Sequence, residues 1–255
     1  MTENHRKSIA ERAIGLVDLT DLNDHCDEAA VSALCQRAQT PYGFVGAICI
    51  WPQFVAHART CLTDTGIPIA TVVNFPSGND SIEVTVKLTR QAILDGADEI
   101  DLVMPYSAFL DGDVVSARHM IEATRRACGD KVLLKVILET GELKDFDQIG
   151  AASDLAISAG ADFIKTSTGK VEVNATLDAA QIMLNAIRRC KKPVGFKPAG
   201  GIKITEDCGA YLALADDIMG SDWVSSKTFR FGASSVLDDL LAAMEGKTSG
   251  SGKDY

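Results

Sequence analysis

Short β-rich runs alternate with helical patterns along almost the whole chain, and this alternation limits the possible folds more than any other feature. Eight β-rich runs are predicted, at residues 13–20, 44–51, 68–75, 97–105, 132–139, 162–167, 193–198 and 228–233. The stretches between them carry helix boundary signals, such as Pro52 at a first helical position. Alternation of this kind indicates parallel strands joined by crossover helices.

A recurring glycine favours a closed barrel over an open sheet. Gly96, Gly160 and Gly220 each end a helical pattern ahead of a predicted strand, at intervals that fit two β/α units of about 30 residues. We therefore predict one α/β domain over residues 1–246, a (β/α)8 TIM barrel with a short N-terminal helix, and a flexible tail over 247–255. A doubly wound open sheet is the alternative, although the first strand lacks a Gly-x-Gly-x-x-Gly turn.

Composition argues against several classes of partner. The 255-residue chain has a net charge of −10 and scattered basic residues, which disfavours nucleic acid and anionic membrane surfaces. Its seven cysteines contain no Cys-x-x-Cys, so we expect a reduced intracellular chain without a zinc site. The polar N-terminus and the lack of a membrane-length apolar run predict a soluble, cytoplasmic protein.

Alternation of side chains along each strand places an unusual number of charges inside the predicted barrel. The strand face that packs on helices must be apolar, so the opposite face points inward. The charged residues on that inward face are Asp18, Glu99, Asp101, Lys135, Glu139, Lys165, Lys197 and Arg230. Barrel interiors are usually filled by aliphatic residues, so this pattern indicates a reactive site. A purely structural ion network is the alternative.

Two of the inward lysines, Lys165 and Lys197, lie on consecutive strands. At ~4 Å two ammonium groups repel by roughly 1 to 4 kcal/mol, so one of them should be neutral near neutral pH. A neutral buried amine is the nucleophile that condenses with a carbonyl to form a Schiff base. The neighbouring Phe163, Thr166 and Ser167 favour Lys165 as the nucleophile and Lys197 as the retained cation. A lysine that merely snorkels to a strand end is the alternative.

Carboxylates next to these lysines are candidates for moving protons. Asp101 and Asp18 either transfer protons, hold a substrate hydroxyl, or serve only as counter-ions. Cys49 points inward as well and is most simply a small wall residue. The histidines lie outside the predicted strands or in helical stretches, and none competes for the role of base: His5, His25, His57 and His119.

Loops after the last three strands predict an anion site. The candidate residues, all at the expected carboxyl end of the barrel, are Gly169, Lys170, Gly200, Gly201, Gly232, Ser234 and Ser235. Loops after strands seven and eight, with backbone amides at a helix N-terminus, are where such barrels usually hold a phosphate. Each glycine pair alone could equally be an ordinary strand-to-helix turn.

Several segments together resemble the motifs of deoxyribose-phosphate aldolase, a class I aldolase family. They are residues 98–101, 134–137, 139–143, 163–170, 195–201 and 230–235, and the likeness extends from about residue 16 to 235. The resemblance implies that Lys165 forms the Schiff base and that Lys197 and Asp101 support proton transfer. It also implies a barrel that needs no metal or other cofactor and is often a dimer.

The resemblance further implies a reaction and its binding residues. This is the reversible cleavage of 2-deoxy-D-ribose 5-phosphate to D-glyceraldehyde 3-phosphate and acetaldehyde, a step of deoxyribonucleotide and carbohydrate catabolism. The phosphate would lie at Gly201, Gly232, Ser234 and Ser235, while Asp18, Thr20 and Cys49 match further pocket positions. Tyr255 is expected to act as a proton relay if the tail folds over the site, and a disordered tail is the alternative.

Two other functions fit the same residues. A phosphosugar isomerase on this kind of barrel would use carboxylates or histidine and would keep its activity in a Lys165→Arg variant. A sensor of phosphorylated metabolites would bind its ligand saturably and release no aldehyde.

Overall fold

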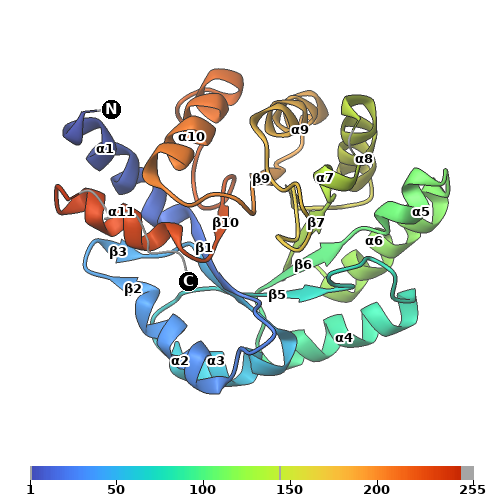
Figure 1. Cartoon of the computed structure of the whole chain (residues 1–255). Helices are drawn as coiled ribbons and strands as arrows, with labels where there is room; N and C mark the ends of the chain where they lie inside the picture. Colours follow the sequence, from blue (N-terminus) through green and yellow to red (C-terminus); the bar gives the residue numbers. More distant parts are fainter. Residues whose placement is uncertain (1, 144, 248–255) are drawn as a thin grey trace.

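Eight parallel strands form the inner layer of the molecule. This computed structural model describes residues 2–143 and 145–247, and the strands lie in the order β10, β1, β4, β5, β6, β7, β8, β9 (Figure 1). Their bounds are β1 Val17–Asp21, β4 Ala47–Ile50, β5 Ile69–Val73, β6 Glu99–Val103, β7 Leu133–Ile137, β8 Phe163–Lys165, β9 Gly195–Lys197 and β10 Phe231–Ala233. Parallel bridges pair Phe196 with Phe229 and Ala199 with Gly232 next to β9 and β10. The ring therefore closes, which confirms the predicted barrel.

Helices form the outer layer and surround the strands in Figure 1. They are α1 Glu3–Ala13, η1 Ile14–Leu16, α2 Glu28–Arg37, η2 Pro52–Phe54, α3 Val55–Cys61, α4 Ile82–Leu94, α5 Tyr106–Leu110, α6 Val114–Cys128, α7 Thr140–Leu143, α8 Phe146–Ser158, α9 Leu177–Cys190, α10 Thr205–Met219 and α11 Val236–Met244. Side chains cap several of them: Ser81 accepts a hydrogen bond from Val84 N at the start of α4. The predicted N-terminal helix, α1, packs against α10 and α11.

All eight predicted runs are longer than the strands that the structure forms there. The first predicted strand began at residue 13, but Ala13 ends α1 and a single 3-10 turn, η1, precedes β1. Ala13, Ile14 and Leu16 are buried, so their apolar pattern serves helix packing instead of a strand. The eighth strand is shorter than predicted and begins at Phe231. A small antiparallel hairpin, β2 Gln39–Thr40 and β3 Gly43–Phe44, lies partly ahead of the second predicted run and was not predicted.

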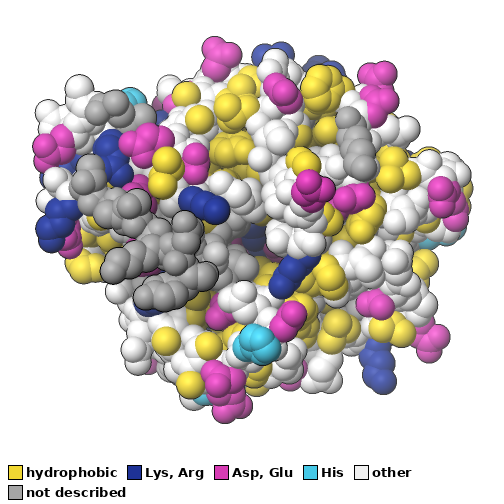
Figure 2. All heavy atoms as spheres, in the orientation of Figure 1, with side chains coloured by type: hydrophobic (Ala, Val, Ile, Leu, Met, Phe, Trp, Pro, Cys, Tyr) yellow, Lys and Arg dark blue, Asp and Glu magenta, His cyan; other side chains and the backbone are white. Residues whose placement is uncertain are grey.

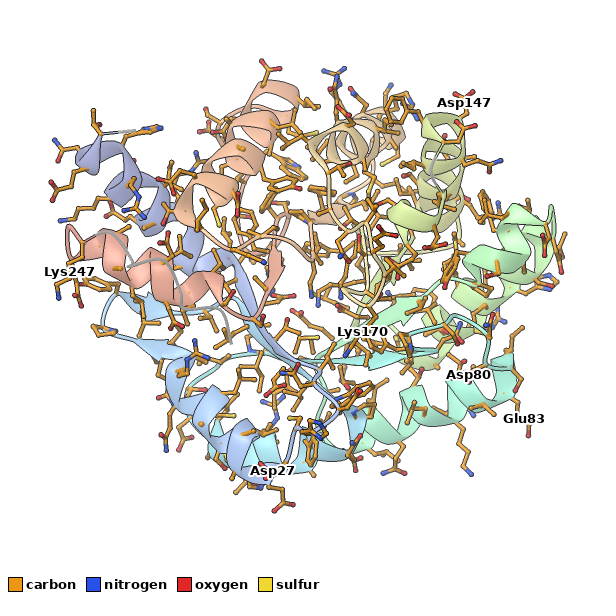
Figure 3. The ribbon with its side chains drawn as sticks, viewed as in Figure 1. Asp27, Asp80, Glu83, Asp147, Lys170 and Lys247 are labelled. Atoms are coloured by element: carbon orange, nitrogen blue, oxygen red, sulfur yellow. The ribbon has the colours of Figure 1, made fainter. Side chains whose placement is uncertain are left out.

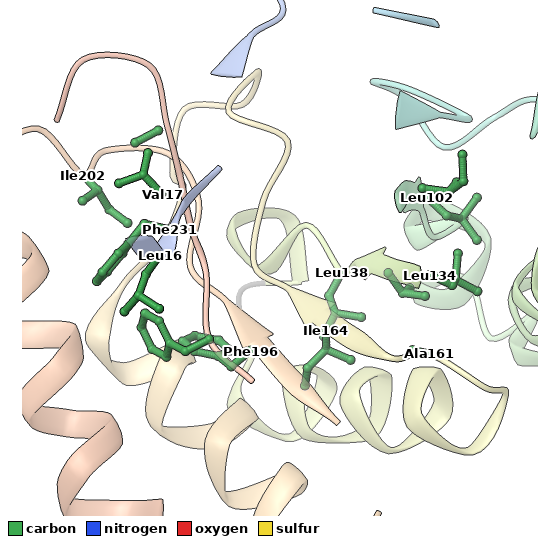
Figure 4. Packing of buried hydrophobic residues seen from close by; sticks show 14 of the residues in the cluster. Leu16, Val17, Leu102, Leu134, Leu138, Ala161, Ile164, Phe196, Ile202 and Phe231 are labelled. Carbon is green, nitrogen blue, oxygen red and sulfur yellow. The ribbon is translucent and has the colours of Figure 1, made fainter. Parts of the chain in front are cut away.

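The main hydrophobic core lies between the strands and the helices. Leu102, Leu134, Ile164 and Phe196 belong to consecutive strands and are fully buried on the outward face (Figure 4). Burying a side chain of this size stabilises the fold by about 1.5–3 kcal/mol. This apolar outer face leaves the inner face free to carry polar groups.

Two glycines make room inside the barrel. A Cβ atom at Gly195 would lie 2.4 Å from the ring of Phe163 on the neighbouring strand. A Cβ atom at Gly232 would lie 3.1 Å from Cε of Lys197 and 2.7 Å from Cβ of Ala199. The interior therefore has space for Lys197 because position 232 carries no side chain.

The repeat seen in the sequence has a structural counterpart. Arg59 packs on Gly96 and pairs with Asp98, while Arg125 packs on Gly160 and pairs with Asp162. In each unit the aspartate also accepts a hydrogen bond from a backbone N–H of the preceding strand, at 2.8 Å. The same Arg–Gly–Asp arrangement thus fixes the entry to β6 and to β8.

Within residues 2–143 and 145–247, every helix is too short or too polar to cross a membrane. Of the predicted tail, only Lys247 is among the described residues; Tyr255 lies outside them.

Candidate active site

A closed ring of alternating charges occupies the barrel interior. We call it the charge ring, and its members, each at most 4% exposed, are Asp101, Lys135, Glu99, Arg230, Asp18 and Lys197. They come from β1, β6, β7 and β9 and from the residue before β10. All six were predicted to point inward.

One half of the charge ring is built on β6 and β7. Lys135 Nζ lies 2.9 Å from Asp101 Oδ1 and 2.5 Å from Glu99 Oε2. Register explains the first contact, because Asp101 and Lys135 are direct partners across the two strands. A third contact, 3.4 Å from Lys135 Nζ to Asp18 Oδ2, crosses the barrel.

The other half of the charge ring runs through Arg230. Its guanidinium lies 2.9 Å from Glu99 Oε1 and 2.6 Å from Asp18 Oδ1. Lys197 completes the circuit, with Nζ at 2.5 Å from Asp18 Oδ2 and 2.8 Å from Asp101 Oδ2. Three carboxylates therefore alternate with three cations, and the buried ring is neutral when all six are ionised.

Lys165 is attached to this ring without belonging to it. Its Nζ donates a hydrogen bond to Asp101 Oδ2 at 2.8 Å, the same oxygen that Lys197 contacts at 2.8 Å. The two ammonium nitrogens are thus separated by no more than twice that distance. Because the ring is already balanced, a proton on Lys165 adds a positive charge that the three carboxylates of the ring do not match.

The pKa values of the two lysines move in opposite directions. Burial lowers the pKa of Lys165; the attraction of Asp101 opposes that effect and the nearby Lys197 adds to it. Burial also acts on Lys197, but Asp101 and Asp18 together raise its pKa above the ordinary value. Repulsion by Lys197, the cause expected from the sequence, lowers the pKa of Lys165 less than burial does. Lys165 is therefore the amine that loses its proton more readily, and Lys197 is the one that holds its proton more tightly.

Both carboxylates beside the lysines stay ionised. Burial alone would raise the pKa of Asp101, but Lys135, Lys165 and Lys197 bring it well below its usual range. Burial and Lys197 are the largest opposing effects on Asp18, whose pKa is also lowered. Each aspartate can therefore accept hydrogen bonds at neutral pH.

A pocket of about 240 Å³ opens above Lys165 at the carboxyl ends of the strands. Its lining includes most of the predicted binding residues: Thr20, Lys165, Gly169, Lys170, Gly200, Gly201, Gly232, Ser234 and Ser235. Figure 2 shows this face hollowed near its centre, and Figure 3 labels Lys170 beside the hollow. Asp18, Cys49, Asp101 and Lys197 are fully buried and do not line the pocket.

The pocket wall opposite Lys170 is made of backbone turns. Gly200 and Gly201 have φ of +83° and +81°, the left-handed region that favours glycine. Ser235 directly precedes α11, so the first free N–H groups of that helix face the same region. The loops predicted to form an anion site therefore line one pocket, and phosphate binding there stays a prediction.

Some predicted residues lie apart from this pocket. Cys49 is buried in a small cluster with Leu22, Ala70 and Val72, and burial raises the pKa of its thiol. Glu139 is buried but lies outside the charge ring, because its backbone φ of +58° turns the chain after β7.

Other pocket residues were missed at the sequence level. Thr168, Asn174 and Lys203 line the pocket as well. Thr168 stands between Lys165 and Lys170 in a segment that was singled out, so its position was a usable signal. Asn174 lies beside Gly200, two residues before Thr176, the cap of α9.

In the described residues, no group of three or more histidine, cysteine, aspartate or glutamate side chains is arranged to hold a metal ion. The chemistry that the site itself offers is that of amines and carboxylates.

Comparisons with known proteins point to aldolases. The model of the DeoC/LacD family aldolases matches residues 12–225. Over 241 residues the chain is 57% identical to the deoxyribose-phosphate aldolase of Agrobacterium fabrum, a match that covers 94% of this chain and 93% of the relative.

Solved structures share the fold at lower identity. A protein of Toxoplasma gondii ME49, provisionally assigned as a deoxyribose-phosphate aldolase, has a TM-score of 0.89 at 23% identity, with 97% of this chain and 98% of that chain covered. The tetrameric deoxyribose phosphate aldolase of Aeropyrum pernix has a TM-score of 0.75 at 22% identity, with coverages of 93% and 91%.

Proposed function

The chain belongs to the DeoC/LacD family of aldolases, and on that premise we propose that it is a deoxyribose-phosphate aldolase of class I. It cleaves 2-deoxy-D-ribose 5-phosphate reversibly to D-glyceraldehyde 3-phosphate and acetaldehyde. The observation that carries the proposal is Lys165, a lysine with lowered pKa that lines the pocket and contacts a neutral charge ring.

The first step is imine formation at Lys165. Its neutral Nζ attacks the aldehyde carbon of the open-chain sugar, and loss of water gives an iminium ion. The iminium withdraws electrons from the bond between C2 and C3, which breaks as the C3 hydroxyl loses its proton. D-glyceraldehyde 3-phosphate leaves, and the enamine that stays on Lys165 takes a proton at C2 before water releases acetaldehyde.

Asp101 and Lys197 are proposed to support these proton transfers. Asp101 Oδ2 contacts both lysine nitrogens at 2.8 Å, so it links the reacting amine to a group that keeps its charge. When Lys165 becomes an iminium ion, its positive charge lies next to the Asp101 carboxylate. That contact stabilises the intermediate relative to the free aldehyde.

The phosphate is proposed to bind at the opposite end of the pocket. Gly201, Gly232, Ser234 and Ser235 form this wall, and Lys170 supplies a positive charge at the rim. Lys170 Nζ donates a hydrogen bond to Leu22 O at 2.8 Å, which already points its ammonium across the pocket mouth. A substrate bound in this way places its aldehyde end at Lys165.

Imine trapping tests the proposal. We expect acetaldehyde and sodium borohydride to leave one ethyl group on the protein, at Lys165, when the digested protein is examined by mass spectrometry. A Lys165→Arg variant should not be labelled and should lose turnover by about 10³-fold or more. Labelling at another lysine, or turnover that survives in Lys165→Arg, would contradict the assignment and favour an isomerase.

We also propose a cellular location and an oligomeric state. All seven cysteines are free, which suits the cytoplasm. Leu110, Val114 and Val115 are exposed apolar side chains on α5 and α6, which suits a homodimer. A single species of monomer mass in sedimentation velocity would contradict the homodimer.

A further inference from the structure

Glu139 is a buried carboxylate that the mechanism above does not use. It follows β7 and its side chain is fully buried. Its φ of +58° lies in the left-handed region, which costs a residue other than glycine on the order of 1 kcal/mol. Backbone strain of this kind clusters at functional sites, and the Glu139 side chain contacts Thr168, which lines the pocket.

The carboxylate of Glu139 is devoted to Thr168. The Thr168 N–H donates to both carboxylate oxygens, at 3.2 and 3.3 Å, and the Thr168 hydroxyl donates to Oε2 at 2.5 Å. Burial raises the pKa of Glu139, while the hydrogen bonds from Thr168 oppose that effect and favour the ionised form. The ionised carboxylate only accepts hydrogen bonds, so it holds the single hydroxyl proton of Thr168. The hydroxyl cannot offer that proton to a ligand.

What remains on the Thr168 oxygen is acceptor capacity. The N–H of Lys170 donates to this oxygen at 3.0 Å, which occupies one of its two lone pairs. Thr168 also lines the pocket together with Lys165 and Lys170. Among the described residues, the partners of this hydroxyl are Glu139 and the Lys170 N–H, so its second lone pair can take a donor that enters the pocket.

We propose that Glu139 is a positioning residue: it fixes the Thr168 hydroxyl as a hydrogen-bond acceptor, and the pocket thereby selects acceptor aldehydes that carry a hydroxyl group beside the carbonyl. This inference rests on the proposed function. It extends that function from the reacting amine to the choice of the second aldehyde.

The geometry of the substrate agrees with this role. A chain that reaches from Lys165 to the glycine and serine loops has two hydroxyl-bearing carbons between its ends. The C3 oxygen must gain or lose a proton during the reaction, a task for the lysine and carboxylate groups. The C4 hydroxyl keeps its proton throughout, and a fixed acceptor on the pocket wall suits it.

The test compares two acceptor aldehydes in the addition of acetaldehyde. One is D-glyceraldehyde 3-phosphate and the other is 3-phosphooxypropanal, which lacks the hydroxyl group. Glu139→Gln keeps the size of the side chain, but its amide can donate to Thr168 and release the hydroxyl proton. The matched control is Glu172→Gln, at an exposed site in the β8–α9 connection, which also carries Thr168.

We expect Glu139→Gln to lower kcat/KM for glyceraldehyde 3-phosphate by about tenfold and for 3-phosphooxypropanal by less than about twofold. Imine trapping at Lys165 should be unchanged, and the control should keep the wild-type preference. A preference that survives in Glu139→Gln, or an equal loss for both aldehydes, would overturn the inference alone. A wild-type protein without aldol activity would overturn the proposed function as well.

A second pair of variants keeps the test decisive if Glu139→Gln does not fold. Thr168→Ser retains the hydroxyl and should keep the preference, whereas Thr168→Val should lose it. Where Glu139→Gln does fold, its combination with Thr168→Val should change the preference no further, because the two residues act through one hydrogen bond. Loss of the preference in Thr168→Ser, or its survival in Thr168→Val, would overturn the inference.

Discussion

Lys165 and Lys197 both contact Asp101, but they differ in the number of carboxylates that each contacts. Lys197 lies between Asp18 and Asp101, at 2.5 and 2.8 Å, whereas Lys165 forms an ion pair with Asp101 alone within the described part of the chain. Both side chains are buried, so burial alone does not distinguish them. The comparison teaches that the supply of counter-ions decides which buried lysine keeps its proton.

The same two lysines also differ in access. Lys165 lines the pocket, and Lys197 is fully buried beneath it. The amine with the lowered pKa is thus the one that a substrate can reach. The following changes are designed to remove or reverse this difference, beginning with the largest effect.

Replacing the shared carboxylate should abolish the difference. Asp101→Asn removes the charge that Lys135, Lys165 and Lys197 all contact. We expect kcat for cleavage to fall by about 10²–10⁴-fold, because proton transfer loses its acceptor. We also expect the free energy of unfolding to fall by about 3–5 kcal/mol, since buried cations lose their partner.

Steady-state kinetics and denaturant unfolding would measure both effects of Asp101→Asn. Kinetics should be recorded in conditions where the unfolding curve shows the variant to be folded. Turnover within tenfold of wild type would mean that Asp101 is only a structural counter-ion.

Replacing the retained cation should slow the chemistry more than it weakens binding. We expect Lys197→Leu to lower kcat by about 10²-fold, with a smaller change in KM, because Lys197 contacts the reacting centre through Asp101 and does not line the pocket. Lys170→Met is the matched comparison, since Lys170 lines the pocket and should mainly raise KM. The reverse pattern would place Lys197 in phosphate binding.

Changing the balance of the charge ring at its far side should move the pH profile. Glu99→Gln removes a negative charge, which makes a proton on Lys165 less favourable, so the acidic limb of kcat/KM should move to lower pH. Arg230→Gln removes a positive charge and should move the same limb to higher pH. Neither residue lines the pocket.

The opposite signs are what distinguish charge balance from damage to the fold. Two harmful substitutions would lower the plateau of the profile without shifting its acidic limb in opposite directions. A shift of the same sign in both variants would contradict the role of the charge ring.

The smallest effect is expected on the outside of the barrel. Asp154 and Arg189 form a surface ion pair at 3.3 Å with both side chains mostly exposed. We expect Asp154→Asn to change the free energy of unfolding by less than about 0.5 kcal/mol and to leave kcat/KM unchanged. A large effect on activity would mean that charges outside the barrel also set the state of Lys165.

Much of the barrel interior could be predicted from the sequence, because strand alternation is a strong signal. Parity placed all charge-ring residues and Lys165 on the inward face, since their strands are regular where they occur. Glu139 follows β7 with a left-handed backbone; its side chain is buried and contacts Thr168 of the pocket lining, and its inward orientation stays a prediction. The predicted start of the first strand was wrong, because Ala13 and Ile14 face helices with the same apolar pattern.

Contacts across the barrel were beyond the reach of the sequence. Arg230 joins Asp18 to Glu99 across the barrel. This contact depends on the stagger between neighbouring strands, and local sequence patterns do not encode that stagger. For the same reason, the number of carboxylates around Lys165 and Lys197 was unknown before the structure. From the sequence, Lys165 was preferred as nucleophile because of its sequence neighbours. The structure adds a physical reason: Lys197 contacts a second carboxylate, Asp18, besides the Asp101 that both lysines share.

The most direct test is an NMR titration of lysines labelled at Cε, with Lys165→Arg and Lys197→Arg used to assign the two signals. We predict that Lys165 titrates below the ordinary lysine range, while Lys197 stays protonated to a higher pH than a free lysine. If both lysines remained protonated together, or if Lys197 lost its proton first, the account of a neutral amine beside a balanced charge ring would be wrong.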